Sequence, residues 1–240
     1  MTNPIYTLLS KQVGLRRQVD LIANNVANLS TTGFKREGMA FATHVQRLEV
    51  PGGSLALAAV GGSHTDLSSG ALERTGNAFD FAIDGSGFFA VETAAGVRYT
   101  RDGRFGTNQL GELVTTTGHR VLDEGGAPIV VPAEVSEIAV SANGALSAPD
   151  GRPLGILGVH DLPDGLLARE ADGLFTAAGE PEPAAGARVV QGFLEGSNVN
   201  PVRELTDLIE AQRAYERGRA MLDTEDERIQ RAIEKLDQEA

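Results

Sequence analysis

The chain has 240 residues, a formal net charge of -12 at pH 7 and no cysteine. The acidic balance argues against nucleic acid or an anionic membrane surface as a partner, because both are bound through clustered Lys and Arg. The missing cysteine excludes disulfides, thiolate chemistry and Cys-ligated zinc. No apolar run approaches the length of a membrane span, and the first ten residues lack the pattern of a cleaved signal peptide.

Residues 3–29 carry the first helical pattern. Apolar side chains recur there at intervals of three and four residues, and Gln12 is the only polar position among them. A repeat of this kind places the side chains along one narrow seam of a helix. Asn3 and Pro4 are typical of a helix N-cap and first helical position. The sequence therefore predicts a first domain over residues 1–36, made of a helix and a short signature loop.

The middle of the chain has a different pattern. Residues 37–70 are rich in small side chains and glycine, and they predict an extended linker. In residues 71–196, short apolar runs alternate with turn pairs such as Asn143-Gly144. Glycine at such pairs supplies the left-handed backbone that tight turns require. This spacing predicts an all-β domain of roughly eight to twelve short strands.

Residues 197–240 repeat the helical pattern of the N-terminus. Asn200 and Pro201 give the same start signal, and the apolar positions again recur at intervals of three and four as far as Leu236. Three positions on this second seam are polar, namely Gln212, Arg219 and Asp226. The segment therefore predicts one long C-terminal helix whose seam is less regular than the first.

Two helical seams at opposite ends of one chain each need a partner for their apolar surface. Residues 1–37 carry five basic and two acidic side chains, whereas residues 201–240 carry seven basic and eleven acidic ones, so their charges favour each other. We therefore predict an α+β fold, with a central all-β domain of short strands flanked by N- and C-terminal helices that form an antiparallel coiled-coil-like pair. The same seams also fit ordinary core-facing helices of one globular domain.

No pattern in the sequence indicates catalysis. The four histidines do not lie at metal-ligand spacing from one another. The Gly-containing run of residues 84–87 lacks the Lys-Ser/Thr of a phosphate-binding loop and leads into an apolar run, so it predicts a β-turn. We predict no catalytic residue, no metal site and no cofactor.

Three parts of the chain resemble the flagellar rod and hook proteins, which form the axial structure of the bacterial flagellum. Residues 22–35 (IANNVANLSTTGFK) look like the N-terminal signature of this family. Residues 80–91 (DFAIDGSGFFAV) and 99–105 (YTRDGRF) are similar to its β-domain signature. Residues 194–202 (LEGSNVNPV) and 208–216 (LIEAQRAYE) resemble its closing segment. Asn is a poor helix former, so the Asn residues of the first signature need a physical reason, and a buried Asn can fix register and partner.

The resemblance implies a structural, non-enzymatic subunit of the basal-body rod. Within this family, the chain is most similar to the proximal-rod members, and a distal-rod or other hook or rod subunit is the alternative. It implies self-assembly through the terminal helices, with further copies and other rod subunits as partners, to transmit torque for motility. It also implies passage through the flagellar export apparatus without signal-peptide cleavage and localisation in the periplasm-spanning rod, with no nucleic acid partner and no membrane insertion.

We expect the assembly contacts to come from the two helical seams and the signature loop. The N-terminal contact residues are Leu15, Val19, Ile22, Asn24, Asn25, Val26, Asn28, Leu29, Gly33 and Phe34. The C-terminal contact residues are Leu205, Leu208, Gln212, Tyr215, Leu222 and Ile229.

Two other functions compete with this hypothesis. A cell-wall glycan-binding or hydrolytic β-domain would need a pair of carboxylates about 5 to 9.5 Å apart in a cleft, which the sequence does not reveal. A coiled-coil adhesin would be favoured by a secretory signal peptide.

Overall fold

The computed structural model describes residues 4–47, 54–135, 137–162, 167–179, 181–184 and 186–238. The chain divides into two compact units. Unit 1 consists of Met1–Ala27, Glu37–His64 and Asn200–Ala240, and unit 2 consists of Asn28–Arg36 and Thr65–Val199. None of the described helices is both long enough and apolar enough to cross a membrane.

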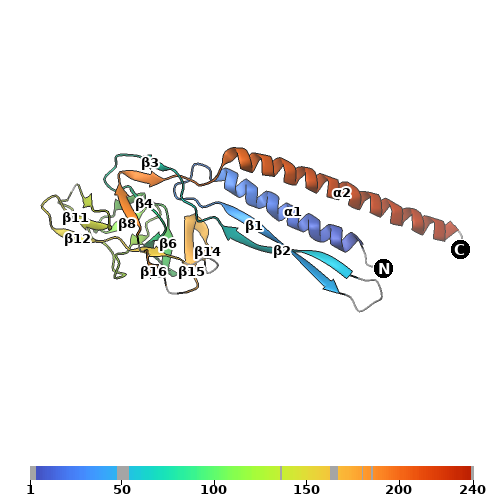
Figure 1. Cartoon of the computed structure of the whole chain (residues 1–240), viewed down its shortest axis with the longest axis horizontal. Coiled ribbons are helices and arrows are strands. Elements are labelled where there is room, and N and C mark those ends of the chain that lie inside the picture. The colour runs from blue at the N-terminus through green and yellow to red at the C-terminus, as the bar shows by residue number, and fades with distance from the viewer. Residues whose placement is uncertain are drawn as a thin grey trace. The chain divides into compact units, whose positions relative to one another are not determined.

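Unit 1 contains the two long helices, α1 (Pro4–Ala27) and α2 (Pro201–Gln238). They lie side by side and run antiparallel (Figure 1). The predicted start of α2 is confirmed, because the Asn200 side chain accepts hydrogen bonds from the backbone N–H groups of Val202 and Arg203. Such an N-cap satisfies donors that have no partner within the helix.

The segment expected to be an extended linker, residues 37–70, is largely strand. Strands β1 (Glu37–Arg47) and β2 (Ser54–Thr65) form a two-stranded sheet in unit 1, and β1 contacts α1. Residues 48–53 of the expected linker lie outside the described residues. The linker interpretation was wrong for the two strands, because small residues without a distinctive alternation can form a β-ladder as well as an extended chain.

Unit 2 is built from short strands. Its largest sheet has nine strands, in which β14-β15-β6-β5-β9-β8-β7 form a continuous path and β13 pairs with both β5 and β16. A three-stranded sheet β10-β11-β12 and the pairs β17-β4 and β18-β3 complete the unit. The strands of the largest sheet are β5 (Phe88–Thr93), β6 (Gly96–Thr100), β7 (Phe105–Thr107), β8 (Leu113–Thr115), β9 (Arg120–Val121), β13 (Val159–Asp161), β14 (Leu167–Arg169), β15 (Leu174–Ala177) and β16 (Glu182–Pro183).

The remaining strands are β3 (Leu72–Arg74), β4 (Phe81–Asp84), β10 (Ala139–Val140), β11 (Ala145–Ser147), β12 (Pro153–Ile156), β17 (Arg188–Gln191) and β18 (Phe193–Glu195). The mostly strand character predicted for this region is confirmed, but the structure has more strands than the predicted eight to twelve. Turn residues interrupt the ladders so often that β9, β10 and β16 contain only two residues each. A short 3-10 helix (Ala171–Gly173) leads into β15.

Most of the described apolar core lies in unit 2. One cluster contains the rings of Phe81, Phe89 and Phe105, and Phe89 meets Phe105 edge to face with their centroids 5.2 Å apart. A second, smaller cluster is centred on Phe88 and Phe175. Because aromatic side chains bury more apolar surface than aliphatic ones, these five rings supply much of the stability of the unit.

Candidate functional site

Three charged side chains are buried together in unit 2, and we call Lys35, Arg101 and Glu195 the Glu195 cluster. The Lys35 Nζ atom lies 2.7 Å from Glu195 Oε1, and Arg101 Nη1 lies 2.9 Å from Glu195 Oε2. All three side chains are at most 2% exposed. A buried carboxylate that faces two cations leaves one positive charge in excess, so neutral oxygens must share in solvating the cluster.

Backbone carbonyls provide those oxygens. Lys35 Nζ donates to the carbonyl of Ser68 at 2.8 Å, and Arg101 Nη2 donates to the carbonyl of Gly85 at 2.8 Å. Glu195 Oε1 also accepts the backbone N–H of Gly70 at 2.8 Å. The cluster therefore joins the signature loop, the chain before β3, the region around β4 and the end of β18.

Burial in the cluster changes the acidity of the lysine. Burial lowers the pKa of the Lys35 ammonium below its ordinary value of 10.5, because desolvation disfavours the charged form. The Glu195 carboxylate opposes this change, and the Arg101 charge adds to it. Charged Lys35 is thus held in the fold at a cost that its hydrogen bonds only partly offset.

The backbone around the cluster is bonded across the same segments. The Gly33 N–H donates to the Glu195 carbonyl at 2.7 Å, and the Arg36 N–H donates to the Asn198 side-chain oxygen at 2.6 Å. Asn198 Nδ2 donates in turn to the carbonyl of Asp66 at 2.9 Å. Residues 33–36, 66–70 and 195–198 therefore form one bonded layer within unit 2.

Two signature residues fit this layer closely. Gly33 has φ of +67°, and a Cβ atom there would lie 2.5 Å from the Arg101 backbone, so the position requires glycine. Phe34 is 3% exposed, and the guanidinium of Arg169 lies 4.0 Å above its ring. The signature loop is thus a fitted part of unit 2 and does not continue α1, although the sequence interpretation grouped it with the N-terminal helix.

A second buried polar contact lies in unit 1. Asn25 is fully buried, and its Nδ2 atom donates to Glu204 Oε2 of α2 at 3.1 Å and to the Glu37 carbonyl of β1 at 2.9 Å. Its Oδ1 atom accepts the Glu37 N–H at 3.0 Å. This amide pairs with backbone on one strand and a carboxylate on the opposite helix, so a shift of either partner would break it.

The helices approach closely at a glycine on α2. Gln12 Nε2 donates to the Tyr215 carbonyl at 2.9 Å, and a Cβ atom on Gly218 would lie 2.3 Å from the same nitrogen. The pairs Asn25–Glu204 and Gln12–Tyr215 run in opposite order along the two helices, which gives the antiparallel register. Gly218 thus leaves room for the Gln12 side chain, and the two helices approach closely at this point.

The structure brings many of the expected contact residues together, and it separates others. In unit 1, Leu15, Ile22 and Asn25 are buried, Val19, Val26, Leu208, Tyr215 and Leu222 are half-buried, and Asn24, Leu205, Gln212 and Ile229 are exposed. In unit 2, Gly33 and Phe34 are buried, and Asn28 and Leu29 are half-buried. The side chains of three further seam positions, Ile5, Ile233 and Leu236, lie outside the described residues.

At every second position of the predicted seam, the buried residue of α2 is the one just before the predicted residue. Glu204 and Ala211 are at most 3% exposed, whereas their neighbours Leu205 and Gln212 face outward. A seam chosen for hydrophobicity selects Leu205, but close helix approach favours small side chains such as Ala211 and Gly218. The polar positions Gln212, Arg219 and Asp226 of the α2 seam are therefore exposed, whereas Gln12 of the α1 seam is buried in the helix contact.

Sequence reasoning did not select the three residues of the Glu195 cluster as contact residues. All three stand inside the quoted signatures, and charged residues within otherwise apolar motifs were the signal that could have identified them. Glu204 carried no such signal, because a carboxylate at the start of a helix also has an ordinary explanation in the helix dipole.

Family models match three separate parts of the chain. Residues 5–35 match the flagella basal body rod protein model, residues 82–148 match the flagellar hook protein FlgE/F/G D1 domain, and residues 190–235 match the C-terminal model of the flagellar basal body rod FlgEFG proteins. Each matched part contributes one residue to the Glu195 cluster.

Curated relatives resemble the chain over almost its whole length. The flagellar basal-body rod protein FlgF of Caulobacter vibrioides is 41% identical over 98% of both chains. FlgF of Mesorhizobium japonicum is 40% identical over 92% of both chains, and FlgG of Bacillus subtilis is 32% identical over 97% of this chain and 98% of its own. The chain therefore belongs to the family of flagellar basal-body rod proteins and is a structural subunit of the rod.

Proposed function

We propose that this subunit belongs to the proximal rod and that it assembles through its terminal helices with further copies and with other rod subunits. Higher identity to the two FlgF proteins than to the FlgG protein supports the proximal position. In this proposal α1 and α2 pair in a coiled-coil-like manner, and the assembled helices transmit torque. The role is mechanical and involves no catalysis, metal or cofactor.

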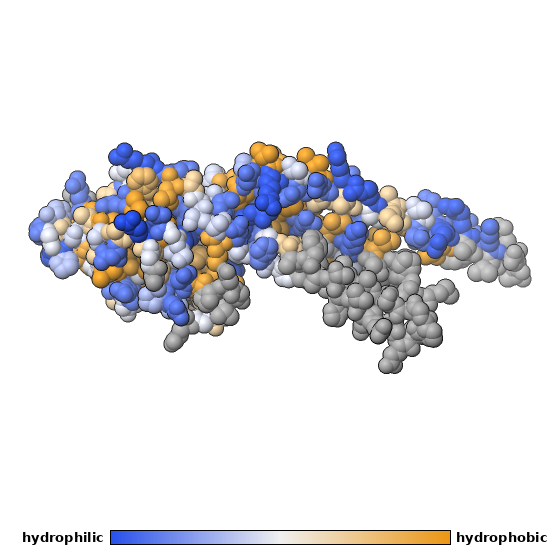
Figure 2. Space-filling model, viewed as in Figure 1, coloured by the Kyte–Doolittle hydropathy of each residue, from blue (hydrophilic) through white to orange (hydrophobic). Residues whose placement is uncertain are grey.

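One observation carries the assembly proposal. The outer face of α2 exposes an apolar stripe of Val202, Leu205 and Ile209, whose exposed fractions are 73%, 51% and 49%. Their spacing of three and four residues places them on one side of the helix, away from Glu204 and Ala211. Hydrophobic side chains reach the surface over the start of α2 (Figure 2). A contiguous apolar stripe on a helix is typical of a surface that another protein covers.

The remaining parts of the proposal concern how the subunit reaches the rod. We propose that it leaves the cell through the flagellar export apparatus without signal-peptide cleavage and takes its place in the periplasm-spanning rod. We also keep the domain boundaries expected at residues 36, 70 and 196 as a proposal about the organisation of the chain.

The assembly proposal can be tested with one substitution on the stripe. Leu205→Glu introduces a charge at an exposed position, so the single chain should fold normally while its packing in the rod is lost. We expect a strain that carries only Leu205→Glu to be non-motile and its basal bodies to lack this subunit. Arg203→Glu is the matched control, because Arg203 is exposed on the other side of the same helical turn. Normal motility with Leu205→Glu would contradict the proposal.

A further inference from the structure

We infer that the free end of α2 in one copy docks into a basic-rimmed groove between α1 and α2 of a second copy. This inference rests on the proposed self-assembly and assigns it a specific contact. Its three supports are a groove without an occupant, a helix end that extends past its intramolecular partner, and complementary charge.

The groove lies at the middle of the helix pair and has a volume of about 460 Å³. Its floor is apolar and small, and it includes Leu15, Ala211 and Ala214. Arg213 and Arg217 stand at its rim, both exposed and both without an ion pair within the described residues. Glu210 is the one acidic side chain in the lining. We call this the Ala214 groove.

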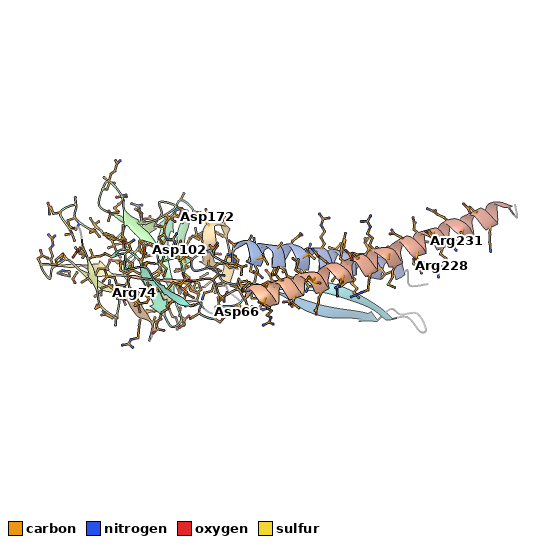
Figure 3. All side chains as sticks on the ribbon, turned by 90° about the horizontal axis from the view of Figure 1, so that it is seen from above. Asp66, Arg74, Asp102, Asp172, Arg228 and Arg231 are labelled. Atoms are coloured by element: carbon orange, nitrogen blue, oxygen red, sulfur yellow. The ribbon has the colours of Figure 1, made fainter. Side chains whose placement is uncertain are left out.

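The helix end that fits it belongs to α2 itself. The contacts of Asn25 with Glu204 and of Gln12 with Tyr215 fix the register, so at equal rise per residue the first residue of α1 lies opposite about residue 225. The last dozen or so residues of α2 therefore extend past α1, as Figure 1 shows. Arg228 and Arg231 lie on this free end (Figure 3).

The free end carries an apolar side chain, Ile229, beyond the described start of α1. Ile229 lies seven residues after Leu222, so it continues the face that α1 covers earlier along α2. It is 39% exposed because α1 has ended before this point. A side chain of this kind can enter the Ala214 groove of a second copy, where the floor is apolar.

Charge directs the free end to this groove. Asp223 and Asp226 lie six and three residues before Ile229 on adjoining turns, both are exposed, and neither forms an ion pair within the described part of α2. Arg228 and Arg231 of the same end are already paired with Glu225 and Glu227. Among the described residues, the free end therefore presents carboxylates without an ion pair, and the groove rim presents guanidinium groups without one, so the two surfaces are complementary.

The contact joins different surfaces of two identical chains. Such a heterologous contact leaves one groove and one free end unused at the two ends of every assembly. Copies can therefore be added without closing into a dimer, as an axial structure requires.

A disulfide test suits this chain because it contains no natural cysteine. Ala214→Cys is placed in the groove of one tagged copy and Ile229→Cys on the free end of a differently tagged copy. The two positions are 15 residues apart on one helix, about 22 Å, so they cannot be linked within one chain. We expect a mixed disulfide dimer when the full-length copies are combined and mildly oxidised. Thr206→Cys replaces Ala214→Cys in the control, because it is exposed outside the groove.

Charge reversal then tests the recognition. Arg213→Glu with Arg217→Glu in the groove copy should lower the linking yield about tenfold. Asp223→Arg with Asp226→Arg in the other copy should restore it when the two altered copies are combined. All substituted positions are on the surface, and the helical circular dichroism of each variant verifies its fold.

The outcomes separate the inference from the proposed function. Association seen by sedimentation, with no link above the Thr206→Cys control, would overturn the docking inference and leave self-assembly intact. A strong link that charge reversal does not affect would also overturn the inference. Absence of any association between copies would contradict both.

Discussion

Glu195 accepts hydrogen bonds from Lys35, Arg101 and the Gly70 backbone at the same time. Removal of this one carboxylate would leave two cations buried side by side. Removal of Lys35 would leave a neutral Arg101–Glu195 pair. Loss of Glu195 should therefore destabilise the fold more than loss of Lys35, although both residues belong to the same ion pair.

We predict that Glu195→Gln lowers the free energy of unfolding by about 3 to 5 kcal/mol, since breaking a buried ion pair leaves an uncompensated charge. Lys35→Met should cost less, and the double variant should be more stable than Glu195→Gln alone because it removes one of the two stranded cations. Urea unfolding followed by circular dichroism measures all three. Equal losses for the two single variants would show that the excess charge does not matter.

The lowered pKa of Lys35 predicts a dependence of stability on alkaline pH. Between the lowered pKa in the folded protein and the ordinary value of 10.5, the unfolded chain binds more protons than the folded chain. The contribution of Lys35 to the free energy of unfolding therefore rises with pH across this window. The free energy of unfolding is measured by urea titration at successive pH values for wild type and Lys35→Met. The difference between the two proteins should rise with pH, and a difference that does not change with pH would exclude this effect.

At the scale of residues, the sequence identified the segments that meet but not the side chains that bond to each other. Asn25 was singled out as a costly residue in a helix, and the structure buries it against Glu204 and Glu37 of the same chain. Lys35 and Glu195 are separated by 160 positions, and no local pattern indicates that they meet. Pairing of this kind depends on the tertiary fold, which periodicity and turn chemistry do not specify.

Among the elements, the helix pair shows most clearly what periodicity can and cannot predict. Both helices and the start of α2 at Pro201 followed from their apolar spacing and caps. The contact face of α2 did not, because Ala211 and Gly218 contribute by being small and carry little hydrophobic signal. Strands β1 and β2 were missed for a related reason, since their small residues give no distinctive alternation.

The close approach at Gly218 gives a prediction for α2. Gly→Ala in a helix usually stabilises it by about 1 kcal/mol through propensity. In wild type this gain should be cancelled or reversed, because the new Cβ atom displaces the Gln12 amide from its bond to the Tyr215 carbonyl. In a Gln12→Ala background, Gly218→Ala should give the full gain. Thermal unfolding followed at 222 nm compares the two backgrounds. Equal gains in stability in both would show that the Gln12 side chain does not oppose the substitution.

For the whole molecule, the two units differ in how much apolar surface each buries. Among the described residues, the buried apolar side chains of unit 1 are Leu15, Ile22 and Ala211, whereas unit 2 contains both core clusters. Ordering a residue costs roughly 1 to 2 kcal/mol, so the helices of an isolated chain have little stabilisation to spare.

We therefore predict that, in a verified monomer whose helix pair is formed, amide exchange is faster across α1 and α2 than in the strands of unit 2. In assembled rods, the exchange of both helices should slow strongly as neighbours cover the stripe on α2. Hydrogen exchange with mass spectrometry on both samples measures this. Strong protection of α1 and α2 in the monomer would instead indicate a helix pair that is stable before assembly.

The long separation between Lys35 and Glu195 also has a consequence in time. If the chain passes through the export apparatus as proposed, with its N-terminus first, Lys35 would emerge 160 residues before Glu195, the carboxylate that neutralises it. Until then the bonded layer of residues 33–36, 66–70 and 195–198 cannot close. Under that proposal, unit 2 would complete its fold only when export is nearly finished, and a chain stalled part-way would still be unfolded enough to continue through the channel.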